Sequence, residues 1–135
     1  MKFVELTEEQ AEDIEERLEE YDQMHMPPAL QGTIRLGIEE DGKLIAGLDA
    51  GLTTFRILYV STVFVDEAYR RKGYGRHLIN AMEARARELG VNTVRLDTFD
   101  FQGKEFYQAM GYTLAGSYEN AEDGYSEYFF VKRLH

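Results

Sequence analysis

Arg70-Arg71-Lys72-Gly73-Tyr74-Gly75 is the stretch that decides how this chain is interpreted, because it joins an apolar β-type run at residues 59–65 to a helical pattern. A helix start leaves backbone N–H groups without internal partners, and the aligned peptide dipoles place partial positive charge there. Gly73 and Gly75 allow close approach of the backbone to an anion and can adopt positive φ values. The loop therefore predicts a phosphate-binding turn, with a glycine turn that only begins a helix as the alternative.

Length and composition indicate one globular domain. The chain has 135 residues, 44% of them hydrophobic, which suits a single domain over residues 1–135 with a real core. No apolar run is long enough to span a bilayer, and Met1-Lys2-Phe3 is not followed by the apolar region of a secretory signal, so we expect a cytoplasmic protein without membrane contact. No cysteine is present and the three histidines are scattered, which predicts neither disulfide nor metal chemistry.

The charge is strongly negative except at the glycine loop. Lys and Arg number 15 against 25 Asp and Glu, a formal charge of -10, which argues against nucleic acid as a partner and favours a cationic substrate. Four of the 15 basic residues nevertheless gather at Arg70, Arg71, Lys72 and Arg76. A local basic cluster on an acidic protein indicates an anionic ligand, such as a group of phosphates.

The N-terminal part of the chain predicts a short strand at residues 3–6 and then an acidic helix. Thr7-Glu8-Glu9-Gln10 has the pattern of a capping box, and Pro27-Pro28 should end the helix. Its other faces are almost wholly Glu and Asp, as in a solvated surface. The positions that recur at helical spacing are Ala11, Ile14, Leu18, Tyr21 and His25.

The rest of the chain predicts a mixed α/β fold. Residues 33–39 and 44–51 form a hairpin around Asp41-Gly42, and residues 56–65 form a longer buried strand. A helix from Arg76 to Leu89 and a strand at 91–98 then complete a right-handed crossover with parallel strands. A short helix at 104–110 and an antiparallel pair at 112–117 and 126–132 complete the pattern.

The glycine loop resembles the acyl-CoA-binding motif of the GNAT superfamily of N-acetyltransferases, which reads Gln or Arg, any, any, Gly, any, Gly or Ala. Arg70, Gly73 and Gly75 match it in full. Many members carry a second motif, Asn, two residues, Ala, two residues, Phe-Tyr and then Gly-Phe. Residues 100–112 keep that spacing, with Asp100, Gly103 and Tyr112 in the places of Asn, Ala and Phe. The resemblance covers the chain from about residue 33 to residue 134.

The resemblance implies a GNAT-like α/β (α+β) fold. Its sheet would be mixed and mostly antiparallel, with six to seven strands, flanking helices and a central parallel strand-helix-strand unit that forms the acyl-CoA cleft. Acetyl-CoA would be the co-substrate, with the strand before the loop pairing with its pantetheine arm and polarising the thioester oxygen. The implied cofactor-binding residues are Val63, Phe64, Val65, Arg70, Arg71, Lys72, Gly73, Tyr74, Gly75 and Arg76.

Catalytic residues follow from the same resemblance. Tyr107 matches the family's tyrosine near the CoA sulfur, which implies a general acid that protonates the departing thiolate. For the base, Tyr59 stands where some protein-lysine acetyltransferases carry Glu, which weakens that substrate class. Asp100 is the carboxylate expected nearest the chemistry, as a base or as a binding residue, and a water chain toward solvent carboxylates is the alternative. His25 lies where the family often borders the acceptor, or is packed at a helix end.

The function implied is transfer of an acetyl group from acetyl-CoA to a small-molecule amine, by direct transfer in a ternary complex. A protein lysine or N-terminal amine is the alternative within the class, and a non-catalytic acyl-CoA sensor is the alternative outside it. Dimers are common in the family, so a homodimer is compatible with the resemblance, although no residue identifies an interface. The sequence names neither the acceptor nor the acyl-chain length.

Overall fold

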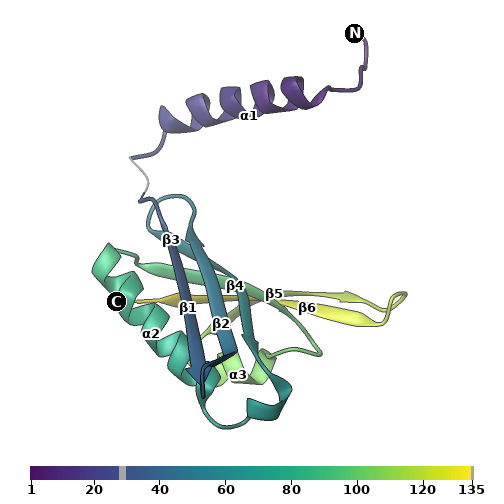
Figure 1. Cartoon of the computed structure of the whole chain (residues 1–135). Coiled ribbons are helices and arrows are strands. Elements are labelled where there is room, and N and C mark those ends of the chain that lie inside the picture. Colours follow the sequence, from purple (N-terminus) through teal and green to yellow (C-terminus); the bar gives the residue numbers. More distant parts are fainter. Residues whose placement is uncertain (28–29, 135) are drawn as a thin grey trace.

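A six-stranded mixed sheet forms the body of the protein in a computed structural model that describes residues 1–27 and 30–134 (Figure 1). The strand order is β1-β2-β3-β4-β6-β5, and β3 and β4 pair in parallel while all other neighbours are antiparallel. The strands are β1 (Thr33–Glu40), β2 (Lys43–Leu52), β3 (Ile57–Val65), β4 (Thr93–Phe99), β5 (Thr113–Asn120) and β6 (Tyr125–Arg133). The helices are α1 (Glu8–Gln23), α2 (Tyr74–Leu89), α3 (Lys104–Ala109) and one 3-10 turn, η1 (Glu67–Tyr69).

The sequence-based fold class is confirmed, including the hairpin and the parallel crossover. Asp41 and Gly42 have φ values of 52° and 77°, the left-handed pair that a tight turn between β1 and β2 requires. Helix α2 connects the parallel strands β3 and β4, and Gly90 ends it with a φ of 91°. Helix α2 begins at Tyr74, two residues before the expected start, because Gly73 is its N-cap.

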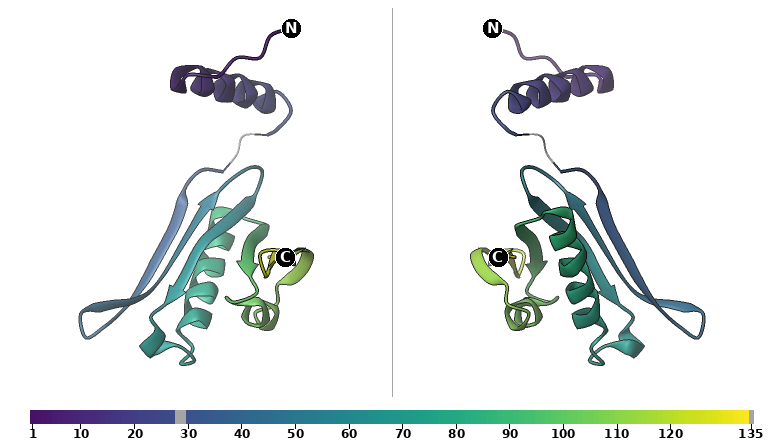
Figure 2. Two further views of the ribbon diagram at one scale, coloured as in Figure 1. Left: turned by 90° about the vertical axis from the view of Figure 1, so that its right-hand side faces the viewer. Right: turned by 90° about the vertical axis from the view of Figure 1, so that its left-hand side faces the viewer.

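The core lies between α2 and one face of the sheet. The apolar stripe of α2 is almost completely buried, with Ile79, Met82 and Ala86 at 0% exposure. Ile34 and Leu58 meet it from the sheet, also at 0%. Figure 2 shows α2 lying along the sheet on this side, and α3 joins the same core through Tyr107. The cluster is contiguous, so these elements form one packed unit.

The opposite face of the sheet is open. Along β4, Val94 and Leu96 are buried while Arg95 and Asp97 between them are exposed, as expected when successive side chains alternate between two faces. The register pairs Asp97 with Phe129 and Arg95 with Val131, so these β6 residues share the open face. We call the side of the sheet that carries them the outer face.

Helix α1 lies apart from this body. The expected capping box is present, since Thr7 Oγ1 accepts from Gln10 N–H and Gln10 Oε1 accepts from Thr7 N–H. The helix ends at Gln23, and Pro28 of the expected helix stop lies outside the described residues. The strand expected at residues 3–6 is wrong, because residues 1–7 are irregular and no strand of the described sheet pairs with them. In the described part of the chain, no helix is long and apolar enough to cross a membrane.

Candidate active site

A cleft opens where the parallel strands β3 and β4 separate. Their pairing runs from Ile57 opposite Thr93 to Val60 opposite Leu96 and stops there. Ser61 is an extra residue in the β2–β3 ladder, because Ala50 pairs with Val60 and Asp49 with Thr62. A bulge bends its strand and increases the local twist. The second half of β3 therefore keeps its pairing with β2 while one backbone edge is free on the cleft side.

The cleft has a volume of about 1050 Å³. Its walls are the free half of β3, the carboxyl end of β4, the loop before α2 and the start of α3. Sites at the carboxyl ends of strands are the usual ligand positions in open sheets of this kind. Nine of the ten residues expected to bind the cofactor line it: Val63, Phe64, Val65, Arg70, Arg71, Gly73, Tyr74, Gly75 and Arg76.

The loop before α2 presents free N–H groups to the cleft. Arg71 has a φ of 62° and Gly73 a φ of 89°, two left-handed residues that turn the backbone into a concave nest. Gly73 caps α2 without a side-chain hydrogen bond, and among the described residues the N–H groups of residues 73–76 have no protein acceptor. A Cβ on Gly73 would meet nothing within 4 Å, so the space above it is open. This arrangement is an anion site built from the backbone.

Gly75 is required for a different reason. A Cβ at this position would lie 3.3 Å from Cζ of Phe106, which is tighter than ordinary van der Waals contact. The absence of a side chain thus lets the start of α2 pack against α3. The two glycines of the motif have separate tasks, since Gly73 supplies the left-handed turn and Gly75 the close packing.

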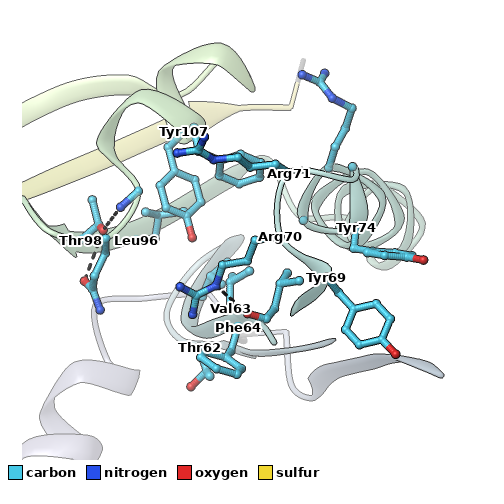
Figure 3. Close-up of a pocket in the computed structure, with 18 of the residues that line it drawn as sticks. Thr62, Val63, Phe64, Tyr69, Arg70, Arg71, Tyr74, Leu96, Thr98 and Tyr107 are labelled. Carbon is cyan, nitrogen blue, oxygen red and sulfur yellow. Dashed lines mark hydrogen bonds between the residues drawn. The ribbon is translucent and has the colours of Figure 1, made fainter. Parts of the chain in front are cut away.

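The four basic residues of the loop are not equivalent. Arg70 donates from Nε to the carbonyl oxygen of Val65 at 2.9 Å, and its guanidinium lies 5.4 Å from the centre of the Phe64 ring. Figure 3 shows Arg70 and Arg71 reaching into the cleft. Lys72 is the expected binding residue that does not line it, because its ammonium lies over the ring of Tyr69 at 5.6 Å. The cleft therefore holds guanidinium groups, which suit phosphate recognition.

Tyr74 lines the cleft with its ring, while its hydroxyl is used elsewhere. That hydroxyl donates to Glu40 Oε1 at 2.8 Å, and this hydrogen bond raises the pKa of Tyr74. The contact ties the start of α2 to the end of β1. Tyr74 therefore helps to hold the loop in place.

Tyr107 projects from α3 into the cleft. Only 9% of the residue is exposed, and its hydroxyl points into the cleft (Figure 3). Burial raises the pKa of Tyr107 to about 12, so the phenol stays protonated at neutral pH. Gly103 N–H donates to Thr98 Oγ1 at 3.2 Å and anchors the start of α3 to the end of β4. The structure thus presents a fixed O–H donor to the cleft.

Two carboxylates near the end of β4 have different surroundings. Asp100 does not line the cleft, and its Oδ2 accepts from Ser126 N–H at 3.2 Å. Asp97 does line it, and accepts from Tyr59 Oη at 2.8 Å, a bond that raises the pKa of Tyr59. Sequence reasoning missed Asp97. A carboxylate near the carboxyl end of a strand that alternates between polar and apolar residues was the signal that could have identified it.

His25, considered as a residue beside the acceptor, lies near the end of α1. Its ring packs on Tyr21 with centroids 4.7 Å apart, and it does not line the cleft. Among the described residues, no three His, Asp or Glu side chains are grouped as metal ligands would be.

A parallel strand pair that separates in front of a helix N-terminus with free N–H groups is the arrangement that the resemblance to the GNAT superfamily implied for an acyl-CoA cleft. The comparisons with known proteins agree with that resemblance. The model of the Acetyltransferase (GNAT) family matches residues 2–112, and the chain belongs to this family. It is an acetyltransferase by that membership, and the resemblance to this family noted in its sequence is confirmed.

Relatives of known name share most of the chain. Blasticidin-S acetyltransferase of Streptomyces morookaense is 40% identical over 96 residues, 70% of each protein. A crystal structure of an acetyltransferase from Bacillus cereus is 29% identical with a TM-score of 0.92, covering 98% of this chain and 97% of the other. A crystal structure of an Agrobacterium tumefaciens acetyltransferase is 27% identical with a TM-score of 0.83, covering 98% and 99%.

Proposed function

We propose that this chain transfers an acetyl group from acetyl-CoA to a primary amine of a small molecule, by direct transfer in a ternary complex. Residues 1–135 would work as a single acetyltransferase domain. The observation that carries the proposal is the nest of free N–H groups at residues 73–76, next to the free edge of β3 in one cleft. A pyrophosphate fits the first feature, and an extended amide-containing arm fits the second.

The loop would hold the phosphates of acetyl-CoA. Backbone N–H groups of residues 73–76 donate to the pyrophosphate oxygens, and the guanidinium groups of Arg70, Arg71 and Arg76 add charge. On the cleft side, residues 63–65 offer a backbone edge that the pantetheine amides would complete, apart from the Val65 carbonyl that accepts from Arg70 Nε. Lys72 lies outside the cleft and would contribute through the general positive field of the loop.

Tyr107 would stabilise the leaving sulfur. As the amine nitrogen bonds to the acetyl carbon, the carbon–sulfur bond breaks and negative charge gathers on sulfur. Because the pKa of Tyr107 is about 12, above the roughly 8.5 of an ordinary thiol, its O–H donates a hydrogen bond to that charge and full proton transfer to sulfur is uphill. We therefore assign Tyr107 the place of the general acid, acting chiefly as a hydrogen-bond donor.

Asp97 is the carboxylate best placed to receive the amine. It lines the cleft and also lies on the outer face, so an amine approaching from that side meets it directly. An ammonium group would be held there by charge and would pass one proton to solvent water before the neutral amine attacks. Asp100, the carboxylate expected from the sequence, would act indirectly by holding the loop after β4 against β6 through Ser126.

The proposed acceptor is a small amine, since a relative of 40% identity is named for its action on blasticidin S. Tyr59 stands where some protein-lysine acetyltransferases carry Glu, and its hydroxyl donates to Asp97. The absence of that Glu favours a small-molecule acceptor over protein lysine. The intact nest and the buried Tyr107 favour an enzyme over a non-catalytic acyl-CoA sensor.

The test is release of free CoA thiol by the purified protein with acetyl-CoA and a panel of amines, with acetyl-CoA binding measured in parallel by calorimetry. The panel includes blasticidin S, aminoglycosides, polyamines and a lysine peptide. Binding with amine-dependent release supports the transferase, and preference for the lysine peptide would move the substrate to the protein class. Binding without release from any amine supports the sensor, and absence of binding overturns the assignment of the loop.

A further inference from the structure

Helix α1 has an apolar face that nothing in its own chain covers. Leu18 is 59% exposed, Tyr21 60% and Met24 76%, and the helix has no buried residue. Within the described ranges 1–27 and 30–134, every hydrogen bond, ion pair and ring contact of residues 1–27 stays inside that segment. Figures 1 and 2 show α1 away from the sheet in three views.

A helix of this composition does not hold its shape alone. It has 16 residues, close to the length at which isolated helices are marginal in water. Like charges face each other four residues apart, as in Glu12 with Glu16 and Glu15 with Glu19, which weakens it further. One helical ion pair, Asp13 with Arg17, offsets little of this because both side chains are more than half exposed. Packing of the apolar face must supply the missing stability.

The outer face of the sheet has the matching properties. It is open, and Phe129 and Phe99 are 37% and 36% exposed on it. Beside Phe129 and Val131 lies a hollow of about 300 Å³, also bordered by Arg95 and Asp97. Aromatic rings and a hollow suit an apolar helix face, while exposed Arg95 and Arg133 suit the carboxylates that flank it.

Overall similarity to related crystal structures bears on the place of the N-terminal segment. Residues 1–30 make up more than a fifth of the chain, so a relative that folded this segment back onto its own sheet would lose about that share of the TM-score. The Bacillus cereus and Agrobacterium tumefaciens structures score 0.92 and 0.83 with 98% of this chain covered. A TM-score of 0.92 over 98% of this chain requires that the N-terminal segment of the Bacillus cereus structure superpose on that of this chain, away from its own sheet.

We propose that two copies of this chain exchange their N-terminal helices, so that α1 of each copy packs on the outer face of the other. The exchange buries the apolar face of α1 and the exposed rings of β4 and β6 together. It also places the acidic helix against a body that carries most of the basic residues, since ten of the 25 acidic residues precede residue 27 while 13 of the 15 basic residues follow it.

The exchange completes the acceptor side of the site. Asp97 belongs to both the cleft and the outer-face hollow, so the partner's helix would bound the entrance through which the amine arrives. This consequence rests on the proposed function. The exchanged dimer itself does not, because its formation can be measured without any substrate.

The first experiment measures the oligomeric state of the full chain by sedimentation equilibrium. The variant Ile14→Gln with Leu18→Gln makes the apolar face polar, and Glu12→Gln with Glu16→Gln is the matched control on the opposite helix face. We expect wild type and control to be dimers, and the apolar-face variant to dissociate at least tenfold more readily. A monomeric wild type, or a dimer that the apolar-face variant leaves unchanged, would overturn the proposal.

The second experiment distinguishes exchange from any other dimer. The chain has no cysteine, so a Leu18→Cys copy is mixed with a Phe129→Cys copy and treated with a short bis-maleimide. We expect a covalent dimer from the mixture, but none from a mixture of Glu16→Cys with Phe129→Cys. Absence of the mixed dimer overturns exchange. A chain that carries both Leu18→Cys and Phe129→Cys is treated in the same way. An internal cross-link in a product of single-chain mass would mean that α1 covers its own sheet, and would also overturn exchange.

Discussion

Two parts of helix α2, its N-terminal end and the surroundings of Glu83 in its C-terminal half, lie about 14 Å apart along one axis and differ in how their polar groups are paired; we call them the open end and the closed end. At its N-terminal end the N–H groups of residues 73–76 have no acceptor among the described residues, and guanidinium groups stand beside them. In its C-terminal half the carboxylate of Glu83 is 3% exposed and fully surrounded by donors. Tyr112 Oη donates to it at 2.9 Å, and Lys132 Nζ at 2.9 and 3.1 Å.

The difference separates binding from stability. A polar group that folding leaves without a partner is available to a ligand, whereas a buried charge that folding has fully paired is available to none. The same helix thus carries a prepared anion site at one end and a closed ion pair at the other. Substitutions at the two ends should therefore change different measurements.

The largest effect is expected at the closed end. Glu83→Ala leaves Lys132 and the Tyr112 hydroxyl without their acceptor in a mostly buried place, and should lower the free energy of unfolding by about 3 kcal/mol or more. Denaturant unfolding measures it, with Glu88→Ala on the exposed side of α2 as the control, expected within about 0.5 kcal/mol of wild type. Glu83→Gln, which keeps an acceptor, should lose less. A loss of acetyl-CoA affinity in folded Glu83→Gln would break the separation of the two ends.

Substitutions at the open end should change the affinity for acetyl-CoA. Gly73→Val fills the space above the nest and should weaken acetyl-CoA binding by about 100-fold or more, because the phosphates need that space. The backbone strain of a branched residue at a φ of 89° is expected as well. Gly124→Val is the matched control, since Gly124 has a φ of 75° and equally open surroundings but lies outside the cleft. Calorimetry that shows equal affinity for both variants would refute the nest.

Two buried tyrosines sharpen the comparison, because Tyr107 faces the cleft at the open end and Tyr112 bonds Glu83 at the closed end. Tyr107→Phe should lower kcat about tenfold to hundredfold with acetyl-CoA affinity within about twofold, since it removes only the hydroxyl in the cleft. Tyr112→Phe, whose hydroxyl bonds Glu83, should lower stability and leave kcat of the folded enzyme unchanged. Steady-state kinetics with the best amine decide it, and an unchanged kcat for Tyr107→Phe would remove that residue from the mechanism.

Alkaline pH should act gradually, through the two buried tyrosines. Burial raises the pKa of Tyr107 to about 12, and burial with the charge of Glu83 raises the pKa of Tyr112, whereas both titrate near 10 in the unfolded chain. Stability from these groups is complete below pH 10 and is lost as the pH rises through 10 toward the folded-state pKa values. The slope should be about 1.4 kcal/mol per pH unit for each group. Urea unfolding between pH 9 and 11 measures it, and each Tyr→Phe variant should show a shallower decline than wild type.

The sequence predicted local elements and the loop well because both depend on short patterns. The Asp41-Gly42 turn and the apolar stripe of α2 are encoded by neighbours within a few residues, so they could be read directly. The prediction of the 3–6 strand failed because a strand needs a partner, and no local pattern supplies one. The position of α1 could not be predicted from the sequence either. Its amphipathic pattern is the same whether its own chain or another chain covers the apolar face.

The sequence predicted the parts of the site that lie within short motifs and missed the parts that depend on contacts between distant residues. The glycine loop and Tyr107 lie in motifs, and the structure brings them into one cleft. Asp97 became visible only through its hydrogen bond from Tyr59, 38 residues earlier in the chain. In the sequence Lys72 is equivalent to its basic neighbours, whereas in the structure its ammonium lies over the Tyr69 ring. Long-range pairing and side-chain direction are the information that a single sequence lacks.

The cleft opens where β3 has one extra residue, Ser61, so the cleft depends on the number of residues in this strand. A substitution at this position changes a side chain but leaves the count of residues, and with it the opening of the two strands, unchanged. Deletion of Ser61 would remove the bulge, so that β3 could run on beside β4 while its later residues keep their partners on β2. Among related sequences, the spacing between β2 and the glycine loop should therefore vary less than the residues that fill it.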